Sequence, residues 1–308
     1  MTEDPLVSIV IPTYYRNHEL VEAIESVEEQ SYSNVETIVV DDSGERNAES
    51  VVEGRDIKYI AFDENRGAQS ARMEGIETAT GKFVQLLDDD DRLQEDKLKK
   101  QVALLREEDD VGVVYSGFVW KDGGVVLPNK DIRGDVLKQA LTFKMAPCIT
   151  STMLIQSSLL EEVLPFKDRP GADDIGFKIE LALRTEFDFV DEPLVIRRDS
   201  EGSRGKSWGS YEGRLQILED YEDVYEHRPA SEYKEAKAYT ELQRAEVELS
   251  NSIWSFDAIL AGVRMCLSYP RVLFFCYLAS IVWGRPGYVL GRKIYSTLLR
   301  DDVDRGKI

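Results

Sequence analysis

Residues 82–93, KFVQLLDDDDRL, place four consecutive carboxylates, Asp88–Asp91, directly after a short apolar run. The apolar run has the length and composition of a buried strand. Carboxylates this close repel one another, and burial would raise their pKa values further. A hard divalent cation would neutralise them, because such cations take carboxylate oxygens as ligands. The run therefore predicts either a metal site at the end of a strand or a solvated turn.

Strand and helix patterns alternate along the first two thirds of the chain. The composition of a buried strand recurs at residues 6–11, 35–40, 57–62, 82–87, 111–120 and 152–156. Helices are expected at residues 18–29, 45–52, 68–80 and 174–184. This alternation predicts a doubly wound, mostly parallel α/β sheet, in which ligands bind beyond the carboxyl ends of the strands. The acidic clusters Asp41–Asp42 and Asp88–Asp91 follow such ends, which indicates site residues.

The composition argues against several classes of protein. The chain has 308 residues, a formal net charge of −20 and a sequence pI of about 4.6, so it would repel a nucleic acid. Acidic residues are spread through nearly every segment, a pattern that favours a halophilic cytoplasm. Three cysteines without a CxxC pair and two histidines argue against disulfides or a zinc site. The acidic N-terminus enters a strand pattern directly, so we expect no signal peptide and a cytoplasmic protein.

The pattern changes in the last third of the chain. Residues 199–207, DSEGSRGKS, predict a mobile polar loop, and the highly charged residues 208–251 predict helices. Between Asp257 and Asp301 there are six basic residues and no acidic one. The uncharged run 272–283 is shorter than the roughly 20 apolar residues that a membrane-spanning helix needs. This region predicts docking on an anionic membrane surface or, alternatively, a core helix whose arginines pair with the acidic surface.

Five motifs follow one another along the chain: VSIVIPTYYR (7–16), VVDDSG (39–44), ENRGAQSARMEGIETATGKFVQLLDDDD (64–91), RPGADDIGFKIEL (169–181) and EPLVIRR (192–198). Their order and spacing resemble the inverting family 2 glycosyltransferases, which have the nucleotide-diphospho-sugar transferase (GT-A) fold. The resemblance covers about residues 6–205. It implies a glycosyltransferase catalytic domain over residues 1–207. The composition and charge predict a helical C-terminal region over residues 208–308, in which residues 259–300 are the basic and apolar segment expected to dock on a membrane surface.

The resemblance implies a site for a nucleotide-sugar donor. The residues that it places around the nucleotide, the sugar and the phosphates are Pro12, Thr13, Tyr14, Asp41, Arg72, Asp88, Asp89, Arg197 and Arg198. Asp41 would accept a hydrogen bond from a uracil-like base, which favours UDP, while capping of the next helix is assigned to Asp42 or Ser43. Arg197 and Arg198 would lead into a loop that closes over the diphosphate and stabilises the leaving group.

The same resemblance assigns the metal site and the catalytic base. Asp88 and Asp90 match the outer carboxylates of a DxD motif that binds Mg²⁺ or Mn²⁺, with Asp90 as the direct ligand. Asp91 is expected to cap the following helix instead of binding the metal. Asp174 matches the base that accepts the acceptor's proton in an in-line displacement, and Asp173 stands where a Glu is commoner. The alternative for this pair is an acidic first turn that stabilises a helix dipole.

Departures from the family pattern reduce the number of reactions that are expected. Asp199 stands near the place where many members carry a histidine, so no histidine is expected to bind metal there. The chain has no Gln-x-x-Arg-Trp motif, which argues against processive polymerisation. We therefore expect transfer of one hexosyl or hexuronosyl group to a hydroxyl or phosphate acceptor, such as a dolichyl or polyprenyl phosphate-linked glycan. By analogy, the chain is similar to archaeal transferases for N-glycosylation of surface-layer proteins, on the cytoplasmic face of the membrane.

Two other functions are compatible with this fold class. A sugar-nucleotidyltransferase would need a glycine-rich, basic loop after the first strand, and PTYYRNHEL (12–20) lacks one. A non-catalytic carbohydrate-binding protein would not need Asp90 and Asp174 together. Replacing each of these two carboxylates and measuring turnover of the donor would separate the three hypotheses.

Overall fold

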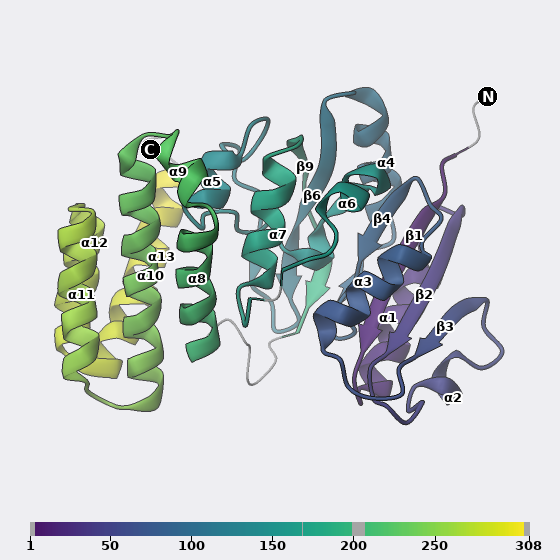
Figure 1. Ribbon diagram of the computed structural model, residues 1–308, viewed down its shortest axis with the longest axis horizontal. Coiled ribbons are helices and arrows are strands. Elements are labelled where there is room, and N and C mark those ends of the chain that lie inside the picture. Colours follow the sequence, from purple (N-terminus) through teal and green to yellow (C-terminus); the bar gives the residue numbers. More distant parts are fainter. Residues whose placement is uncertain (1–3, 168, 199–206, 305–308) are drawn as a thin grey trace. The chain divides into compact units, whose positions relative to one another are not determined.

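The computed structural model describes residues 4–167, 169–198 and 207–304, which divide into two compact units (Figure 1). The first unit comprises residues 1–140, 144–168 and 173–201 and contains the β-sheet. The second comprises residues 141–143, 169–172 and 202–308 and consists mainly of helices. The predicted loop at residues 199–207 lies, except for Ser207, outside the described residues.

The sheet of the first unit has the strand order β3-β2-β1-β4-β8-β6-β9-β5, with β7 paired to β6. Its strands are β1 (Val7–Thr13), β2 (Val35–Asp41), β3 (Ile57–Ala61), β4 (Phe83–Leu86), β5 (Arg92–Leu93), β6 (Val111–Trp120), β7 (Val125–Val126), β8 (Leu154–Gln156) and β9 (Glu186–Arg197). The pairs among β1 to β4 are parallel, whereas β8 runs antiparallel to both of its neighbours. The predicted α/β sheet is confirmed, with β5, β7 and β8 making it mixed.

Helices cover both faces of the sheet. They are α1 (Asn17–Glu28), α2 (Glu49–Val52), α3 (Ala68–Thr78), α4 (Lys97–Glu107), α5 (Leu137–Leu141), the 3-10 turn η1 (Thr150–Thr152), α6 (Ser157–Val163) and α7 (Asp173–Ala182). Ile9 and Ile11 of β1 pack with Leu20 of α1 in one buried core. The next residue of the pleat, Val10, faces α3, where a Cβ at Gly75 would lie 2.2 Å from its Cγ1. The strand is therefore buried on both sides, which explains its continuous apolar run.

The helical unit has its own core. Its helices are α8 (Trp208–Asp220), α9 (Glu222–Glu226), α10 (Ala230–Asn251), α11 (Phe256–Ser268), α12 (Val272–Val282) and α13 (Gly284–Asp304). Small side chains such as Ala245 of α10 and Ala261 of α11 pack with Phe274 of α12 in one cluster. The prediction of helices over residues 208–251 is confirmed. Among the helices that the structure describes, none has the length and hydropathy required to cross a bilayer.

The order of the strands reverses beside β1. The chain adds β2 and then β3 on one side of β1, and it returns to place β4 on the other side. The carboxyl ends of two such neighbouring parallel strands are where α/β sheets commonly bind ligands. Residues 13–16 follow β1 and residues 88–91 follow β4, so the fold brings these two segments together.

Candidate active site

The acidic run is held in a defined turn. The N–H of Leu87 donates to the carbonyl of Val10 at 2.9 Å, so the pairing of β4 with β1 continues up to the first aspartate. The N–H of Asp91 donates to the carbonyl of Asp88 at 3.0 Å and closes the turn. Ser151 Oγ accepts the N–H of Asp88 at 3.2 Å. We call residues 88–91 the acidic cluster.

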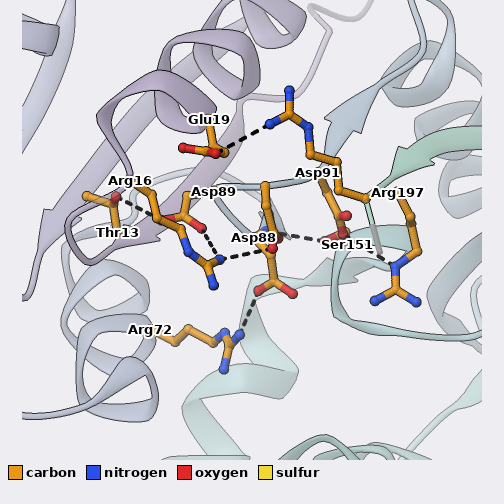
Figure 2. A network of polar contacts seen from close by, with 11 residues as sticks. Thr13, Arg16, Glu19, Arg72, Asp88, Asp89, Asp91, Ser151 and Arg197 are labelled. Carbon is orange, nitrogen blue, oxygen red and sulfur yellow. Dashed lines mark hydrogen bonds and ion pairs between the residues drawn. The ribbon is translucent and has the colours of Figure 1, made fainter. Parts of the chain in front are cut away.

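Arg16 binds the middle of the acidic cluster (Figure 2). Its Nη1 lies 3.0 Å from Asp89 Oδ1 and 2.9 Å from Asp90 Oδ2. Thr13, at the end of β1, donates to the other oxygen of Asp89 at 2.9 Å. Burial raises the pKa of Asp89 to about 6, although these two partners oppose the rise. The segment after β1 therefore contributes a hydroxyl and a guanidinium to the cluster.

Two further arginines approach the cluster from other elements (Figure 2). Arg72 of α3 donates from Nη2 to Asp88 Oδ1 at 2.6 Å. Arg197, at the end of β9, lies with its Nε 3.8 Å from Asp91 Oδ2 and packs against the ring of Trp120. Each arginine thus faces a different part of the acidic run.

Asp91 is the most deeply buried carboxylate of the cluster, with 2% of its side chain exposed. Burial and the nearby charge of Asp88 raise the pKa of Asp91 to about 7, against the opposing charge of Arg197. Its Oδ2 and the Nε of Arg197 are both buried and, among the described residues, neither has a hydrogen-bond partner. The gap between these two atoms leaves each of them available to a ligand atom.

Three members of the cluster fit a metal ion. Asp88, Asp90 and Asp91 can each offer one carboxylate oxygen, and these oxygens lie within 4.8 Å of one another. Oxygen ligands suit Mg²⁺ or Mn²⁺, and Oδ2 of Asp91, which has no hydrogen-bond partner among the described residues, can serve as such a ligand. The residues present therefore fit the predicted ion, and they add Asp91 to the predicted pair.

The predicted helix cap at Asp91 is wrong. The following helix, α4, begins at Lys97, and its N-cap residue is Asp96, which makes no side-chain hydrogen bond to the helix. Asp91 instead precedes the short strand β5, which pairs with β9 and so brings Arg197 close to the cluster. Asp91 cannot cap α4, because β5 lies between them and the helix begins several residues later.

Asp41 is fully buried at the end of β2. It accepts the N–H groups of Ser43 and Ala48 at 2.9 and 2.7 Å and the hydroxyl of Tyr59 at 2.7 Å. Burial alone would raise the pKa of Asp41, but these hydrogen bonds lower it. The carboxylate therefore orders the loop after β2. Its predicted contact with a nucleotide base stays a prediction, and a base would have to share oxygens that already accept hydrogen bonds.

Asp42 has a different role from the predicted one. Its carboxylate accepts the N–H groups of Arg66 and Gly67 at 2.6 and 2.8 Å, directly before α3. The next helix, α2, has Ala48 at its N-cap and no side-chain cap, so the predicted capping by Asp42 or Ser43 is wrong. Asp42 instead fixes the start of the helix that carries Arg72. The helix predicted at residues 45–52 is shorter in the structure and spans Glu49–Val52.

Asp173 and Asp174 form the first turn of α7. Asp174 Oδ2 lies 2.9 Å from the Nζ of Lys178, one turn later, and the side chain of Asp174 is 43% exposed. Lys178 is buried and also donates to the carbonyl of Cys148 at 3.2 Å. The charges of Asp88, Asp173 and Asp174 raise the pKa of Arg72 against the opposing effect of burial. The acidic cluster, through Asp88, and the Asp173–Asp174 pair thus both act on Arg72.

The remaining predicted residues differ in exposure and partners. Pro12 and Thr13 are buried at the end of β1, whereas the ring of Tyr14 is half exposed and packs edge-on against Tyr15. Arg198 binds Glu22 of α1 and lies 3.5 Å from Glu19 on the same helix. Of the two predicted arginines, the structure brings Arg197 to the acidic cluster and holds Arg198 at α1. Asp199 lies outside the described residues.

Comparison with other sequences identifies the family. Residues 8–164 match the family described as Glycosyl transferase family 2. An uncharacterized glycosyltransferase from Rickettsia prowazekii is 30% identical over 235 residues, which cover 72% of this chain and 70% of that protein. The chain belongs to glycosyltransferase family 2. It is therefore a glycosyltransferase that uses a nucleotide-sugar donor, as the motifs predicted.

A shorter match concerns a glycosyltransferase of defined specificity. The UDP-Glc:alpha-D-GlcNAc-diphosphoundecaprenol beta-1,3-glucosyltransferase WfgD of Escherichia coli is 33% identical to this glycosyltransferase over 119 residues. The match covers 38% of this chain and 47% of WfgD. It thus extends over less than half of either protein.

Two solved structures share the fold. Residues 1–349 of TarS from S. aureus, in complex with UDP-GlcNAc, give a TM-score of 0.61 at 17% identity, covering 94% of this chain and 91% of that one. The mannosyltransferase PcManGT from Pyrobaculum calidifontis, in complex with GDP-Man and Mn²⁺, gives 0.57 at 18% identity, covering 95% and 87%. These likenesses confirm the predicted GT-A-type fold of this glycosyltransferase.

Sequence reasoning missed three residues of this glycosyltransferase site. Arg16 ends the quoted motif VSIVIPTYYR, and only the pairing of β1 with β4 brings it to the acidic cluster. Asp91 was expected to cap a helix and not to bind the metal. Lys178 stands four residues after Asp174, and this spacing places both side chains on one helix face, so a test for i,i+4 pairs would have found it.

Proposed function

We propose that this glycosyltransferase moves a single sugar, with inversion, from a nucleoside-diphosphate sugar, UDP-linked, to a hydroxyl or phosphate acceptor, with Mg²⁺ or Mn²⁺ bound. The observation that supports this proposal most is the convergence of carboxylate oxygens from Asp88, Asp90 and Asp91 within 4.8 Å of one another. They converge at the end of β4, where the strand order reverses and α/β sheets commonly bind nucleotides.

The donor side of the proposed site combines carboxylates with arginines. A divalent ion held by Asp88, Asp90 and Asp91 would neutralise the diphosphate of the leaving group. The guanidinium groups of Arg72 and Arg197 lie beside the same carboxylates and can bind phosphate oxygens through charge-assisted hydrogen bonds. In this proposal the arginines hold the diphosphate in place and keep its charge matched as the bond to the sugar breaks.

Asp174 is proposed as the general base. The acceptor oxygen attacks the anomeric carbon and forms the new glycosidic bond, while the bond from that carbon to the diphosphate breaks. The acceptor's proton passes to Asp174, and the nucleoside diphosphate leaves with the electron pair of the broken bond. Asp174 is partly exposed at the start of α7, where an acceptor can reach it. Asp173 is proposed to orient the acceptor.

Lys178 supports this assignment of the base. Its buried ammonium group lies 2.9 Å from Asp174 Oδ2, on the turn that follows. The second bond of Lys178, to the carbonyl of Cys148, fixes where the ammonium group lies. We propose that Lys178 orients the carboxylate of Asp174 and holds it in one rotamer.

The proposed acceptor is a glycan linked to a polyprenyl or dolichyl phosphate. The name of WfgD states that this relative uses a diphosphoundecaprenol-linked acceptor, and the basic, apolar segment 259–300 is compatible with work at a lipid surface. This acceptor would place the glycosyltransferase on the cytoplasmic face of the cell membrane. The halophilic origin and the role in N-glycosylation of surface proteins stay predictions.

The full-length protein should be incubated with a panel of nucleotide sugars, Mg²⁺ or Mn²⁺ and a polyprenyl phosphate-linked acceptor, with release of nucleoside diphosphate as the readout. Asp90→Asn and Asp174→Asn should each lower kcat by about 10²-fold or more, because one holds the ion and the other accepts the proton. Asp131→Asn, an exposed aspartate far along the chain from both, is the matched control and should leave turnover unchanged.

Each other outcome of this experiment contradicts part of the proposal. Unchanged turnover in both Asp90→Asn and Asp174→Asn would exclude the proposed mechanism. Turnover that requires added pyrophosphate and forms a nucleoside triphosphate and a sugar 1-phosphate would indicate a sugar-nucleotidyltransferase. Binding of sugars without turnover of any donor would indicate a carbohydrate-binding protein. Full activity after removal of divalent ions by a chelator would exclude the metal.

A further inference from the structure

Helix α11 exposes an apolar stripe. Phe256, Val263 and Leu267 are exposed and Leu260 is half-buried between them, at steps of four, three and four residues. Such steps place all four side chains on one face of a helix. The opposite face, with Ala258, Ala261 and Met265, packs into the core of the helical unit. An amphipathic helix of a folded domain normally exposes its polar face, so the exposed apolar stripe of α11 calls for a partner.

Helix α12 repeats this arrangement. Val272, Phe275, Ala279 and Val282 are exposed at steps of three, four and three residues, so they too share one helix face. The helix packs on α11, and a Cβ at Gly262 of α11 would lie 2.9 Å from Cδ1 of Leu278. Leu267 and Val272, on either side of the connecting turn, are 79% and 81% exposed. Two neighbouring helices thus each leave an apolar face in water.

The loops that precede α11 and follow α12 add a corner of large side chains. Ile253 is 75% exposed, Trp283 is 79% exposed, and Trp254 is about half exposed. The corner is held in one conformation, because the indole of Trp254 donates to the carbonyl of Val282 at 3.2 Å and the N–H of Arg285 donates to that of Ile253 at 2.7 Å. The indole of Trp254 and the backbone around Ile253 and Gly284 are therefore held in place.

The same corner requires a glycine. Gly284 has φ +69°, and a Cβ there would lie 2.4 Å from the carbonyl oxygen of Ile253. Any other residue would force the two loops apart. The backbone at Gly284 therefore adopts a conformation that favours glycine, and it brings Ile253 and Trp283 to one end of the helix pair.

Charge separates this region from the rest of the chain. Six basic residues and no acidic residue lie between Asp257 and Asp301, in a protein whose net charge is −20. Arg264 is exposed on α11, and Arg285 and Lys293 are exposed on α13, the helix that follows α12. Arg271 and Arg292 approach Glu235 and Glu246 of α10 at 3.5 and 3.8 Å, so part of the positive charge is matched within the unit.

We propose that the stripes of α11 and α12 and the corner at Ile253 and Trp283, together the apolar face, dock on the surface of an anionic lipid bilayer. Amphipathic helices that lie in the interface bury apolar side chains at the level of the headgroups while basic residues bind anionic lipids. Exposed tryptophans suit the same level, because the ring is apolar and its N–H remains polar.

A second copy of this chain fits the apolar face less well. A symmetric dimer through this face would gather the exposed Arg264, Arg285 and Lys293 of both copies at one interface. Like charges across an interface oppose association, whereas an anionic lipid surface attracts them. The acidic remainder of the protein would be repelled by the same surface, so binding should be confined to this region.

Sedimentation with vesicles tests this proposal on the full chain, without donor or acceptor, so its result is independent of the transfer reaction. The protein should bind vesicles that contain about 30% phosphatidylglycerol and should bind pure phosphatidylcholine vesicles more weakly. The double variant Leu267→Ser, Val272→Ser should weaken the partition coefficient at least about tenfold, because two apolar side chains no longer leave water. Leu127→Ser, a half-exposed apolar residue of the other unit, is the matched control.

A charge variant provides a second readout. Arg264→Gln with Arg285→Gln should weaken binding to the anionic vesicles about thirtyfold and leave binding to neutral ones nearly unchanged, since each of the two basic residues contributes about 1 kcal/mol near an anionic surface. Lys99→Gln with Lys130→Gln, two exposed lysines of the other unit, controls for the change in net charge. Unfolding curves that match those of the wild type would show that the variants are folded.

Three outcomes would overturn the proposal. The first is no binding to anionic vesicles at about 0.1 M salt. The second is equal weakening by the control variants and by the variants of the apolar face. The third is a dimer in analytical ultracentrifugation that Leu267→Ser, Val272→Ser dissociates while vesicle binding is absent, which would make a second copy the partner.

Discussion

The acidic cluster and the apolar face are two regions of unusual charge, and they are built in opposite ways. The four carboxylates of the cluster are consecutive, but their arginines come from positions 16, 72 and 197. The apolar face comes from one continuous stretch, residues 253–285. The cluster therefore acquires its chemistry only when the sheet forms, whereas the character of the apolar face is already present in the local sequence. Substitutions in the acidic cluster should therefore change both the stability of the fold and the activity. Substitutions in the apolar face should change membrane binding without changing stability.

The largest effect should come from Asp91→Asn, which asks whether the buried carboxylate belongs to the metal site. We expect the affinity for Mn²⁺ and the value of kcat/KM to fall about 10²-fold or more, because one ligand of the ion is lost. The metal-free variant should be more stable than the wild type at pH 8, because it lacks a charge that burial and Asp88 disfavour. Calorimetric titration with Mn²⁺ and thermal unfolding without metal measure the two quantities.

Asp96→Asn is the matched control for this prediction. Asp96 is the exposed N-cap residue of α4, makes no side-chain hydrogen bond to the helix and lies outside the cluster. It should leave the affinity for Mn²⁺ and the kinetics unchanged. If Asp91→Asn lowers the stability of the metal-free protein and leaves the affinity for Mn²⁺ intact, then Asp91 has a structural role and the cluster loses its third ligand.

Much of the fold was predictable from the sequence, and the reason is local. The buried strands at 35–40 and 111–120 carry enough apolar residues to be recognised without their neighbours, and the helix at 68–80 lies between two such strands and ends before Gly81. Each occurs within about two residues of its predicted range. The start of α4 was mispredicted because the two-residue strand β5 intervenes, and its formation depends on pairing with β9, far along the chain. A pairing between distant segments leaves no local signal.

The site was predictable in its residue types and less so in its contacts. The acidic run marked the end of β4, yet nothing near Arg16 in the sequence indicates that its guanidinium spans Asp89 and Asp90. Similarly, Arg197 and Arg198 are adjacent and were assigned one role. Because successive side chains at the end of a strand point in opposite directions, they meet different partners, Asp91 and Glu22.

A second prediction uses pH to separate the two regions. Asp89, with a pKa of about 6, and Asp91, with a pKa of about 7, hold their protons more tightly in the folded metal-free protein than an ordinary aspartate at 3.8. The folded state therefore loses stability as the pH rises from about 4 to about 7, by about 3 kcal/mol for Asp89 alone. Mn²⁺ at about a hundred times its Kd should restore roughly 2.7 kcal/mol at pH 8.

Amide hydrogen exchange can measure this prediction region by region. Protection of the amides of β1 and β4 should fall between pH 5 and pH 8 without metal, after correction for the intrinsic rate, and should recover with Mn²⁺. The amides of α11 and α12 are the internal control, because no acidic residue follows Asp257 in either helix. Equal loss of protection in both regions would mean that the net charge of −20, and not the cluster, sets the pH dependence.

The smallest effect should come from Arg198→Gln, compared with Arg197→Gln. Arg198 binds Glu22 and lies near Glu19 at the partly exposed side of α1, so its loss should cost about 0.5–1 kcal/mol of stability and change kcat/KM less than about threefold. Arg197 faces Asp91, so Arg197→Gln should raise the KM for the donor about tenfold. Steady-state kinetics with varied donor measure both. An equal rise in KM for the two variants would mean that Arg198 leaves α1 to bind the diphosphate, and the separate partners of these adjacent arginines would then describe only the protein without its donor.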